Sequence, residues 1–449
     1  PHHNMNIKIG QVLYLNHMSI SKEEVQTINM QNVLYIVAPF LQTVKKASFQ
    51  NQCQIKFFYA PMLATIEEYG FSECINLGHV VSDNLKELGT EAFSNCLNLK
   101  EINLENVEQF GRQAISYCAI QKISNKLCKN VNEQIIYENP TLEVLDFQNL
   151  EHFDTANFSE GCENLKFLRL PSVRTVNGIL ENLVVTSDSS DIVKQNNTVG
   201  ELPEVNLHTK PDADQLSKLK SQNEDFVHKR VLYGRNINQP LMKNVKGVVL
   251  LHQTSIPENA FMENRLLNFV HCPRVKHIGD HAFQECYFLR SIHSNLVETI
   301  GNSSFTLCTS LSKINTRKVT SLQPRSFDSC CSLIELQFDV LEEVPDHCFT
   351  DCLLLLQIVG ENIRQVSPNA FDKDEEDSEQ ESNVVNIVTN KIAFGEYEGY
   401  KVGPKLNIGE VLFEQFEERN LVLQRIKKVK MLSQIIMNEQ GSLQKVKQE

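Results

Sequence analysis

Apolar residues return at a fixed interval along most of the chain. In the second half an aliphatic anchor recurs every 22 residues, followed by a phenylalanine five residues later and mostly by a leucine eleven residues later. The anchors are Ile256, Ile278, Ile300, Leu322, Val344 and Val366, and the phenylalanines are Phe261, Phe283, Phe305, Phe327, Phe349 and Phe371. A unit of this length cannot bury its apolar face alone, so the recurrence predicts stacked coils that share one core.

The spacing inside the unit predicts the elements of one coil. Segments such as Leu99–Leu104 and Leu165–Leu170 alternate with a period of two, which is typical of a short strand. An alanine before the repeated phenylalanine predicts a helical turn on the opposite side of the coil. Each coil would then add one strand to a parallel ladder with a spacing of about 4.8 Å.

The first half carries the same signal in a more degenerate form. Its anchors are Val44, Ile66, Leu88 and Phe110, with phenylalanine five residues after each of the first three. A further unit runs from Phe153 to Leu170 after a degenerate one. We therefore expect two arrays, residues 44–176 and 255–371.

Other segments depart from the repeat. Residues 1–43 are expected to form an N-terminal cap and the first strand, residues 177–254 interrupt the rhythm, and residues 372–383 form an acidic linker. Within the interruption, Leu216, Leu219 and Phe226 have helical spacing, and "VKGVVLLHQTS" has the pattern of the strand that leads into the second array. We interpret the interruption as an insertion that joins two stacks, with a dedicated binding element as the alternative.

Residues 384–449 form a C-terminal segment. "KIAFGEYEGYKVG" predicts a hairpin or a turn-rich stretch because glycines alternate with aromatic residues. Beyond it an amphipathic helix is predicted from the spacing of Leu412, Phe416, Leu423, Ile426 and Ile435. A capping role for this helix is favoured over a role as a partner helix.

The repeated residues follow the pattern I-x-x-x-A-F-x-x-C-x-x-L-x-x-I. This pattern resembles the BspA-like (Treponema pallidum type) leucine-rich repeat, which occurs in many protist and bacterial proteins. The resemblance covers Val44–Val176 and Ile256–Phe371. It implies an α/β repeat fold, a leucine-rich-repeat solenoid of 22-residue coils with a parallel β-sheet on the concave face, in two arrays. The implied role is the binding of proteins or surfaces along that sheet.

Composition narrows the classes of function. The formal net charge of −13 disfavours a general nucleic-acid binder. No apolar window of about 18 residues occurs, so no membrane-spanning helix is predicted, and the first residues lack the apolar core of a secretory signal. We expect a cytoplasmic location, with cell surface or secretion as the alternative if the chain, which begins at Pro1, is truncated.

Cysteine recurs eight residues after the anchor in both arrays. These positions are Cys74, Cys96, Cys118, Cys286, Cys308, Cys330 and Cys352. Free cysteine is among the most buried residue types, so a cysteine that keeps the core period is predicted to fill space rather than to react. The local pairs Cys330–Cys331 and Cys348–Cys352 have no histidine pair that would complete a zinc site. We therefore expect no metal and no cofactor. The sequence also has no nucleophile elbow, phosphate loop or metalloprotease motif, so no enzyme activity is expected.

The binding surface is predicted from the strands. Residues between the buried strand positions would point to the concave face. They are Glu101, Asn103, Asp146, Phe167, Arg169, Ser291, His293, Lys313, Asn315, Glu335, Gln337 and Gln357. The set is mixed in charge and indicates contact with a protein partner. A few residues of the set would carry most of the binding energy.

Three hypotheses about function stay open at this point. The leading one is a non-enzymatic scaffold for protein–protein interaction, with a partner bound along the concave surface. The second is a surface-attached or secreted adhesin or antigen of the same fold. The third is a regulator or an enzyme whose activity lies in the non-repeat segments.

Overall fold

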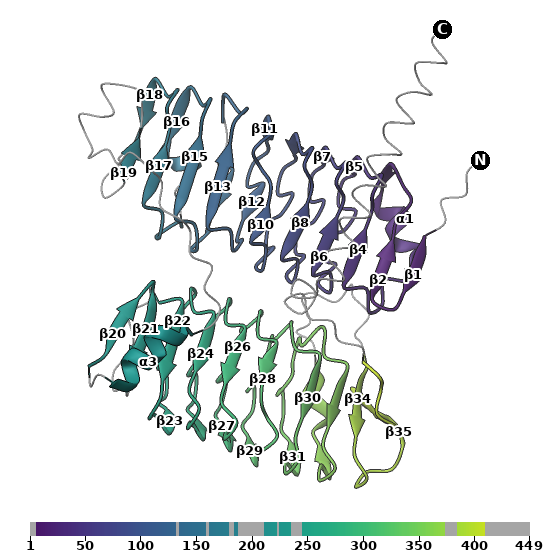
Figure 1. The fold of residues 1–449 in the computed structure, drawn as a ribbon. Helices are drawn as coiled ribbons and strands as arrows, with labels where there is room; N and C mark the ends of the chain where they lie inside the picture. The colour runs from purple at the N-terminus through teal and green to yellow at the C-terminus, as the bar shows by residue number, and fades with distance from the viewer. Residues whose placement is uncertain are drawn as a thin grey trace. The chain divides into compact units, whose positions relative to one another are not determined.

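The computed structural model describes residues 6–131, 134–158, 161–178, 184–186, 211–221, 224–234, 245–372 and 384–408. The chain divides into two units, one formed by Pro1–Leu202 with Ile408–Glu449 and the other by Pro203–Asn407. Each unit has its own apolar core, and its strands stack coil by coil into parallel ladders (Figure 1). The predicted solenoid of 22-residue coils in two arrays is confirmed.

The main sheet of the first unit takes strands from successive coils. It begins with an antiparallel pair and continues in parallel. Its strands, in spatial order, are β1 (Ile7–Ile9), β2 (Val12–Tyr14), β4 (Tyr35–Val37), β6 (Phe57–Tyr59), β8 (His79–Val81) and β10 (Glu101–Ile102). The next coils form a separate four-stranded sheet, which we count with the main sheet; its strands are β13 (Lys122–Asn125), β15 (Val144–Phe147), β17 (Phe167–Arg169) and β19 (Val184–Thr186).

A second row of short strands lies at the anchor positions of the first unit, and the sequence did not predict it. Its strands are β3 (Ser19–Ile20), β5 (Thr43–Val44), β7 (Thr65–Ile66), β9 (Glu87–Leu88), β11 (Gln109–Phe110), β16 (His152–Asp154) and β18 (Thr175–Asn177). A further pair, β12 (Ile115–Ser116) and β14 (Ile136–Tyr137), lies in the turns. The helical elements are α1 (Lys22–Gln26), which Ser21 and Glu24 begin with a capping box, and the 3-10 helix η1 (Thr155–Asn157).

The second unit repeats this plan. Its main sheet contains β20 (Phe226–His228), β21 (Val231–Gly234), β22 (Gly247–Leu250), β24 (Phe269–His271), β26 (Ser291–His293) and β28 (Lys313–Ile314). The following coils form a separate five-stranded sheet, which we count with the main sheet; its strands, in spatial order, are β30 (Glu335–Gln337), β32 (Gln357–Val359), β34 (Val385–Val388), β36 (Tyr400–Val402) and β35 (Gly395–Tyr397). The second row contains β23 (Ser255–Ile256), β25 (His277–Ile278), β27 (Thr299–Ile300), β29 (Ser321–Leu322), β31 (Glu343–Val344) and β33 (Gln365–Val366). The helical elements are α3 (Ala213–Ser221) and the 3-10 helix η2 (Pro368–Phe371).

In the first unit, β1 to β4 and α1 lie within the predicted N-terminal segment, and β19 lies within the predicted interruption. The other non-repeat segments that can be compared with the predictions lie in the second unit. The helical spacing ends earlier than predicted, because Phe226 belongs to strand β20, where its ring stacks on Tyr233 at 5.0 Å. The strand leading into the second array is present as β22, and the predicted hairpin is β35–β36. The amphipathic helix predicted from Leu412 to Ile435 lies outside the described residues, as do residues 187–210 and nearly all of the acidic linker.

The prediction of a helical turn before the repeated phenylalanine is confirmed only in the 3-10 helices η1 and η2 and is wrong for the other described coils. The segment is a tight turn with left-handed residues three and seven positions after the anchor, such as Tyr69 (φ 58°) and Glu73 (φ 61°). Its N–H groups bond to the next coil, from Tyr69 N to Thr90 O (2.9 Å) and from Phe71 N to Ala92 O (2.8 Å). Non-glycine residues rarely adopt positive φ, so these bonds between coils hold a backbone that would otherwise be strained.

The predicted aromatic column is confirmed in the core of the second unit. Phe283 and Phe305 stack with their ring centroids 5.3 Å apart and their planes 2° apart. The same stacking continues in both directions, from Phe261 to Phe371. In the first unit the column holds three rings, Phe49, Phe71 and Phe93. Stacked rings at this spacing gain dispersion energy in addition to the area that they bury.

The cysteine column lies beside the aromatic column and does more than fill space. Cys286 and Cys308 are fully buried, and each thiol donates a hydrogen bond to the carbonyl of the aromatic residue one coil earlier. The Sγ–O distances are 3.0 Å from Cys286 to Phe261 and 3.1 Å from Cys308 to Phe283. A cysteine is therefore small enough for the column and also supplies a weak donor. All thirteen cysteines are free thiols.

Candidate protein-binding surface

The candidate surface is the outer face of each main sheet, defined here as the strand side chains that point away from the core. In the second unit its first strands are covered by the chain itself. Helix α3 places Leu219 against outer-face residues of β21, β22 and β24, in an apolar cluster with Val231, Tyr233, Val249 and Phe269. The backbone N–H of Asp212, just before the helix, also donates to the Tyr233 hydroxyl (3.0 Å). This end of the outer face is therefore occupied.

The last strands of the same face are crossed by residues 403–406, which we call the strap. Gln357 on β32 holds the strap through both polar atoms of its side-chain amide, which bond to the backbone of Leu406. On the neighbouring strand β34, Asn386 donates to the Pro404 carbonyl (3.0 Å). The predicted site residue Gln357 is therefore completely buried and is not part of the exposed surface. The sequence could not indicate this, because the covering residue follows 49 positions later.

The strands β26, β28 and β30, between α3 and the strap, are called the central strands here. These strands, with the residue directly after β28, carry six of the predicted site residues. Ser291 is buried, His293 is exposed, and the other four are half-buried, namely Lys313, Asn315, Glu335 and Gln337. The surface is therefore rich in hydrogen-bonding groups of both charges.

Polar contacts order the central strands. Arg317 donates to the Gln337 side-chain oxygen (2.8 Å), and Asn315 donates to Asn295 (3.0 Å). The rings of His271 and His293 lie 6.2 Å apart. Burial lowers the pKa of His271, and the neighbouring His293 lowers it further because two positive charges would repel each other. The arrangement can present oriented donors and acceptors to a peptide.

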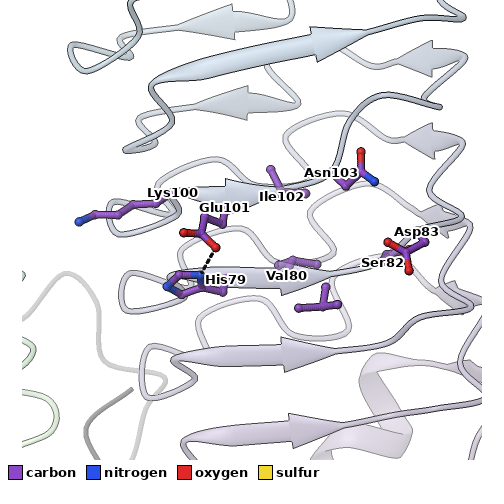
Figure 2. Close-up of a pocket in the computed structure, with 9 residues that line it drawn as sticks. His79, Val80, Ser82, Asp83, Lys100, Glu101, Ile102 and Asn103 are labelled. Carbon is purple, nitrogen blue, oxygen red and sulfur yellow. Dashed lines mark hydrogen bonds and ion pairs between the residues drawn. The ribbon is translucent and has the colours of Figure 1, made fainter. Parts of the chain in front are cut away.

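In the first unit, Glu101 and Asn103 are exposed at a shallow hollow over β8 and β10 (Figure 2). The hollow has a volume of about 360 Å³. It contains a hydrogen bond between His79 Nδ1 and Glu101 Oε2 (3.0 Å). The side chains of Lys100 and Asp83 add one charge of each sign at the rim.

The other predicted residues of the first unit lie on β15 and β17. Asp146 is buried, Phe167 is half-buried and Arg169 is exposed. Arg169 lies 3.6 Å from Asp146. Burial nevertheless raises the pKa of the Asp146 carboxyl, because desolvation outweighs the attraction of the nearby guanidinium. Asp146 Oδ1 has no hydrogen-bond partner among the described residues.

An aromatic stretch on the outer face of β4 and β6 was not predicted from the sequence. Tyr35, Phe57 and Tyr59 alternate with the core residues Ile36 and Phe58 and are buried without belonging to the core cluster. The strand sequences "YIV" and "FFY" carry the signal, since an aromatic residue at an outward position departs from the alternation of apolar and polar residues.

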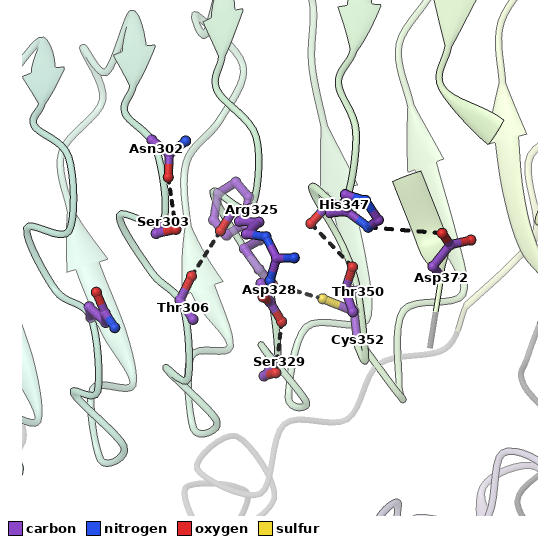
Figure 3. A network of polar contacts seen from close by, with 12 residues as sticks. Asn302, Ser303, Thr306, Arg325, Asp328, Ser329, His347, Thr350, Cys352 and Asp372 are labelled. Atoms are coloured by element: carbon purple, nitrogen blue, oxygen red, sulfur yellow. Dashed lines mark hydrogen bonds and ion pairs between the residues drawn. The ribbon is translucent and has the colours of Figure 1, made fainter. Parts of the chain in front are cut away.

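The turns of the second unit carry a polar network (Figure 3). Arg325 pairs with Asp328 (3.4 Å), and Ser329 donates to the same carboxylate (2.8 Å). One coil later His347 lies 3.9 Å from Asp372. These contacts join neighbouring residues within and between coils, and we assign them to the stability of the turns. Within the described residues no group of three or more potential ligands could hold a metal ion, and no helix is long and apolar enough to cross a membrane.

The family is shown by comparison of the sequence with known families. The model for the "BspA type Leucine rich repeat region (6 copies)" matches residues 20–78, 64–183 and 254–376, which is more than half of the chain. The chain therefore belongs to the family of BspA-type leucine-rich-repeat proteins. No curated protein matches it.

Solved structures with a similar fold include a leucine-rich cell surface protein from Faecalibacterium prausnitzii, which is 16% identical, with 83% of this chain and 96% of that chain covered and a TM-score of 0.28. Another is the pneumococcal vaccine antigen PcpA, at 15% identity, 86% and 82% coverage and a TM-score of 0.28. The leucine-rich-repeat protein of T. pallidum is 18% identical, with 30% and 77% coverage and a TM-score of 0.23.

Proposed function

We propose that the protein is a non-enzymatic scaffold that binds a protein partner along the outer faces of its main sheets. The observation that carries the proposal is the set of central strands. On these strands a row of polar side chains is exposed or half-buried on the outer face of the sheet. The two ends of the same face are covered by α3 and the strap. Preorganised side chains lose little entropy on binding.

The proposal is tested by charge reversal at three outer-face positions. Glu101→Lys, Lys313→Glu and Glu335→Lys, each in the full chain, serve as bait for capture of partners from a lysate of the source cells. Rim charges change association strongly while leaving the fold intact, so we expect at least one reversal to reduce recovery of a partner by about tenfold. Lys276→Glu is the matched control, because Lys276 pairs with Glu298 near the second row of strands. Full recovery with all three variants would contradict the proposal.

We further propose a reducing compartment such as the cytoplasm. Thirteen free thiols without a disulfide are typical of proteins that are kept reduced. Thiol titration of the native and the unfolded protein separates this proposal from the adhesin hypothesis. The full set of thiols titrating after unfolding without a reductant supports it, whereas oxidised pairs support export.

A further inference from the structure

Three side chains hold the strap, two of them through its backbone and one through the side chain of a lysine. Gln357 Nε2 donates to Leu406 O (3.1 Å), and Leu406 N donates to Gln357 Oε1 (2.9 Å). Asn386 binds the Pro404 carbonyl, as described above. Lys405, the residue between them, lies with its ammonium 3.4 Å from Glu335 on strand β30. Three consecutive residues are therefore bound: Pro404 by the amide of Asn386, Lys405 by the carboxylate of Glu335, and Leu406 by the amide of Gln357.

Burial is distributed unequally between the two sides of this contact. Gln357 and Asn386 are 0% and 1% exposed, whereas the strap residues 404–406 are exposed and Leu406 keeps 39% of its surface in water. The strap therefore inserts no apolar side chain into the core. Polar contacts hold it, and any peptide with the same backbone groups could replace them one for one.

Side-chain amides are suited to this kind of recognition. A primary amide offers two donors and an acceptor in a fixed plane, so it can bind the N–H and the C=O of one residue whatever the side chain of that residue. Main-chain bonds of this kind supply affinity in peptide-binding domains, and neighbouring pockets supply specificity. Here Glu335 can distinguish between peptides, because its carboxylate favours a basic residue at the position that Lys405 occupies in the strap.

We propose that Gln357, Asn386 and Glu335 form a binding site for an extended peptide segment with a basic residue, and that the strap is its internal occupant. The partner segment presents a carbonyl at the position of Pro404, a cation at that of Lys405 and a free backbone N–H and C=O at that of Leu406. The inference rests on the proposed function, since it assumes a protein partner on this face. It names the chemistry of one part of that partner.

Because the strap occupies the site, binding of a free peptide has to be measured in competition with it. A tethered segment competes with an effective concentration on the order of millimolar, so a free peptide binds weakly to the unaltered chain. The experiment therefore uses the full chain with a weakened strap, the double variant Lys405→Glu and Leu406→Pro. The first substitution removes the cation, and the second removes the N–H that Gln357 accepts. The probe is the synthetic peptide VGPKLNI, residues 402–408, with a fluorescein label.

Fluorescence polarisation is expected to show at least about tenfold tighter binding of the peptide to the double variant than to the unaltered chain. Adding Gln357→Leu to the double variant should abolish the gain, and the peptide VGPELNI should bind several-fold more weakly. Lys405→Glu alone keeps the experiment decisive if the double variant fails to fold, because that side chain is 57% exposed. It should bind the peptide about threefold more tightly than the unaltered chain.

Two results would overturn the proposal. If the peptide binds neither strap variant while their circular dichroism is unchanged, the strap is a structural cap. If it binds and Gln357→Leu has no effect, the peptide occupies another place. Neither result affects the proposed scaffold function, which the reversals at Glu101 and Lys313 test outside this site.

Discussion

The two arrays both stack their coils around an apolar interior, but they do so with different regularity. In the second, residues paired across neighbouring coils are 22 apart, as in Ile256, Ile278 and Ile300, and the aromatic column has no break. In the first, the step is 21 from Ile115 to Ile136 and 23 from His152 to Thr175. The column stops after Phe93, because Ile115 occupies the next position.

The core of the first array remains continuous despite this break. Phe158, at the repeated aromatic position of a later coil, packs edge-on against Phe147 of β15 at 5.2 Å and stacks on the anchor residue Phe153 at 4.8 Å. The comparison shows that stacking of coils requires a filled interior and that no single residue position has to supply it. In the regular column of the second array, each inner phenylalanine stacks on another phenylalanine at both of its faces.

The largest expected difference between the arrays is their response to alkali. Burial raises the pKa of five thiols in the first unit and six in the second, namely Cys74, Cys96, Cys118, Cys128 and Cys162, and Cys272, Cys286, Cys308, Cys330, Cys348 and Cys352. Above about pH 9 the unfolded chain loses thiol protons that the folded chain retains, so stability falls as the pH rises. Each thiol contributes about 1.4 kcal/mol per pH unit.

Both units should therefore lose stability in alkali, and the stability of the second should fall more steeply with pH. Hydrogen exchange with mass spectrometry from pH 7 to 11 follows each unit separately. In the triple variant Cys286→Ala, Cys308→Ala and Cys330→Ala the alkaline loss of the second unit should become shallower than that of the first. Stability unchanged up to pH 11 would show that the buried thiols do not control this transition.

The next effect comes from the aromatic columns. Phe305 stacks on a ring at each side, whereas Phe93 stacks on Phe71 alone among the described rings. Phe305→Ala should destabilise its unit by about 4 kcal/mol and Phe93→Ala by about 3 kcal/mol, since both leave a cavity and only the first breaks two stacks. Urea unfolding with detection by hydrogen exchange measures the two losses. Equal losses would mean that the second stack contributes nothing.

The smallest effect concerns the left-handed turn residues. Leu307 (φ 61°) and Asn95 (φ 59°) occupy the same position, seven residues after the anchor, in the two arrays. Asparagine tolerates this conformation better than leucine. Leu307→Asn should therefore stabilise its unit by about 0.5 kcal/mol, and Asn95→Leu should destabilise its unit by about 1 kcal/mol. Thermal unfolding of the exchanged pair checks both signs, and two changes of the same sign would show that side-chain packing decides.

The columns could be predicted because each depends on a residue type that returns at a fixed offset. The second row of strands and the left-handed turns could not, since they depend on backbone bonds between coils. Their positions hold residues as different as Tyr69, Leu307 and Arg325, so no residue preference reveals them.

The candidate surface was predicted in outline only. Alternation along the strands predicts outward positions for Glu101, His293 and Gln337, and in the structure the first two side chains are exposed and the third is half-buried. It could not reveal that Gln357 is covered, or that α3 closes the first strands, because both covers come from segments outside the repeat. The burial of an outward side chain depends on distant parts of the chain, and the local pattern contains no information about them.

The main sheets end in antiparallel hairpins at three places: β1 with β2, β20 with β21, and β35 with β36. A parallel ladder that ended on a bare coil would offer its open edge to the coil of another molecule. A hairpin reverses the direction of its outer strand, so a further coil of the repeat meets the wrong hydrogen-bond pattern. The hairpins therefore disfavour end-to-end stacking of separate molecules, although neighbouring coils share the same backbone pattern.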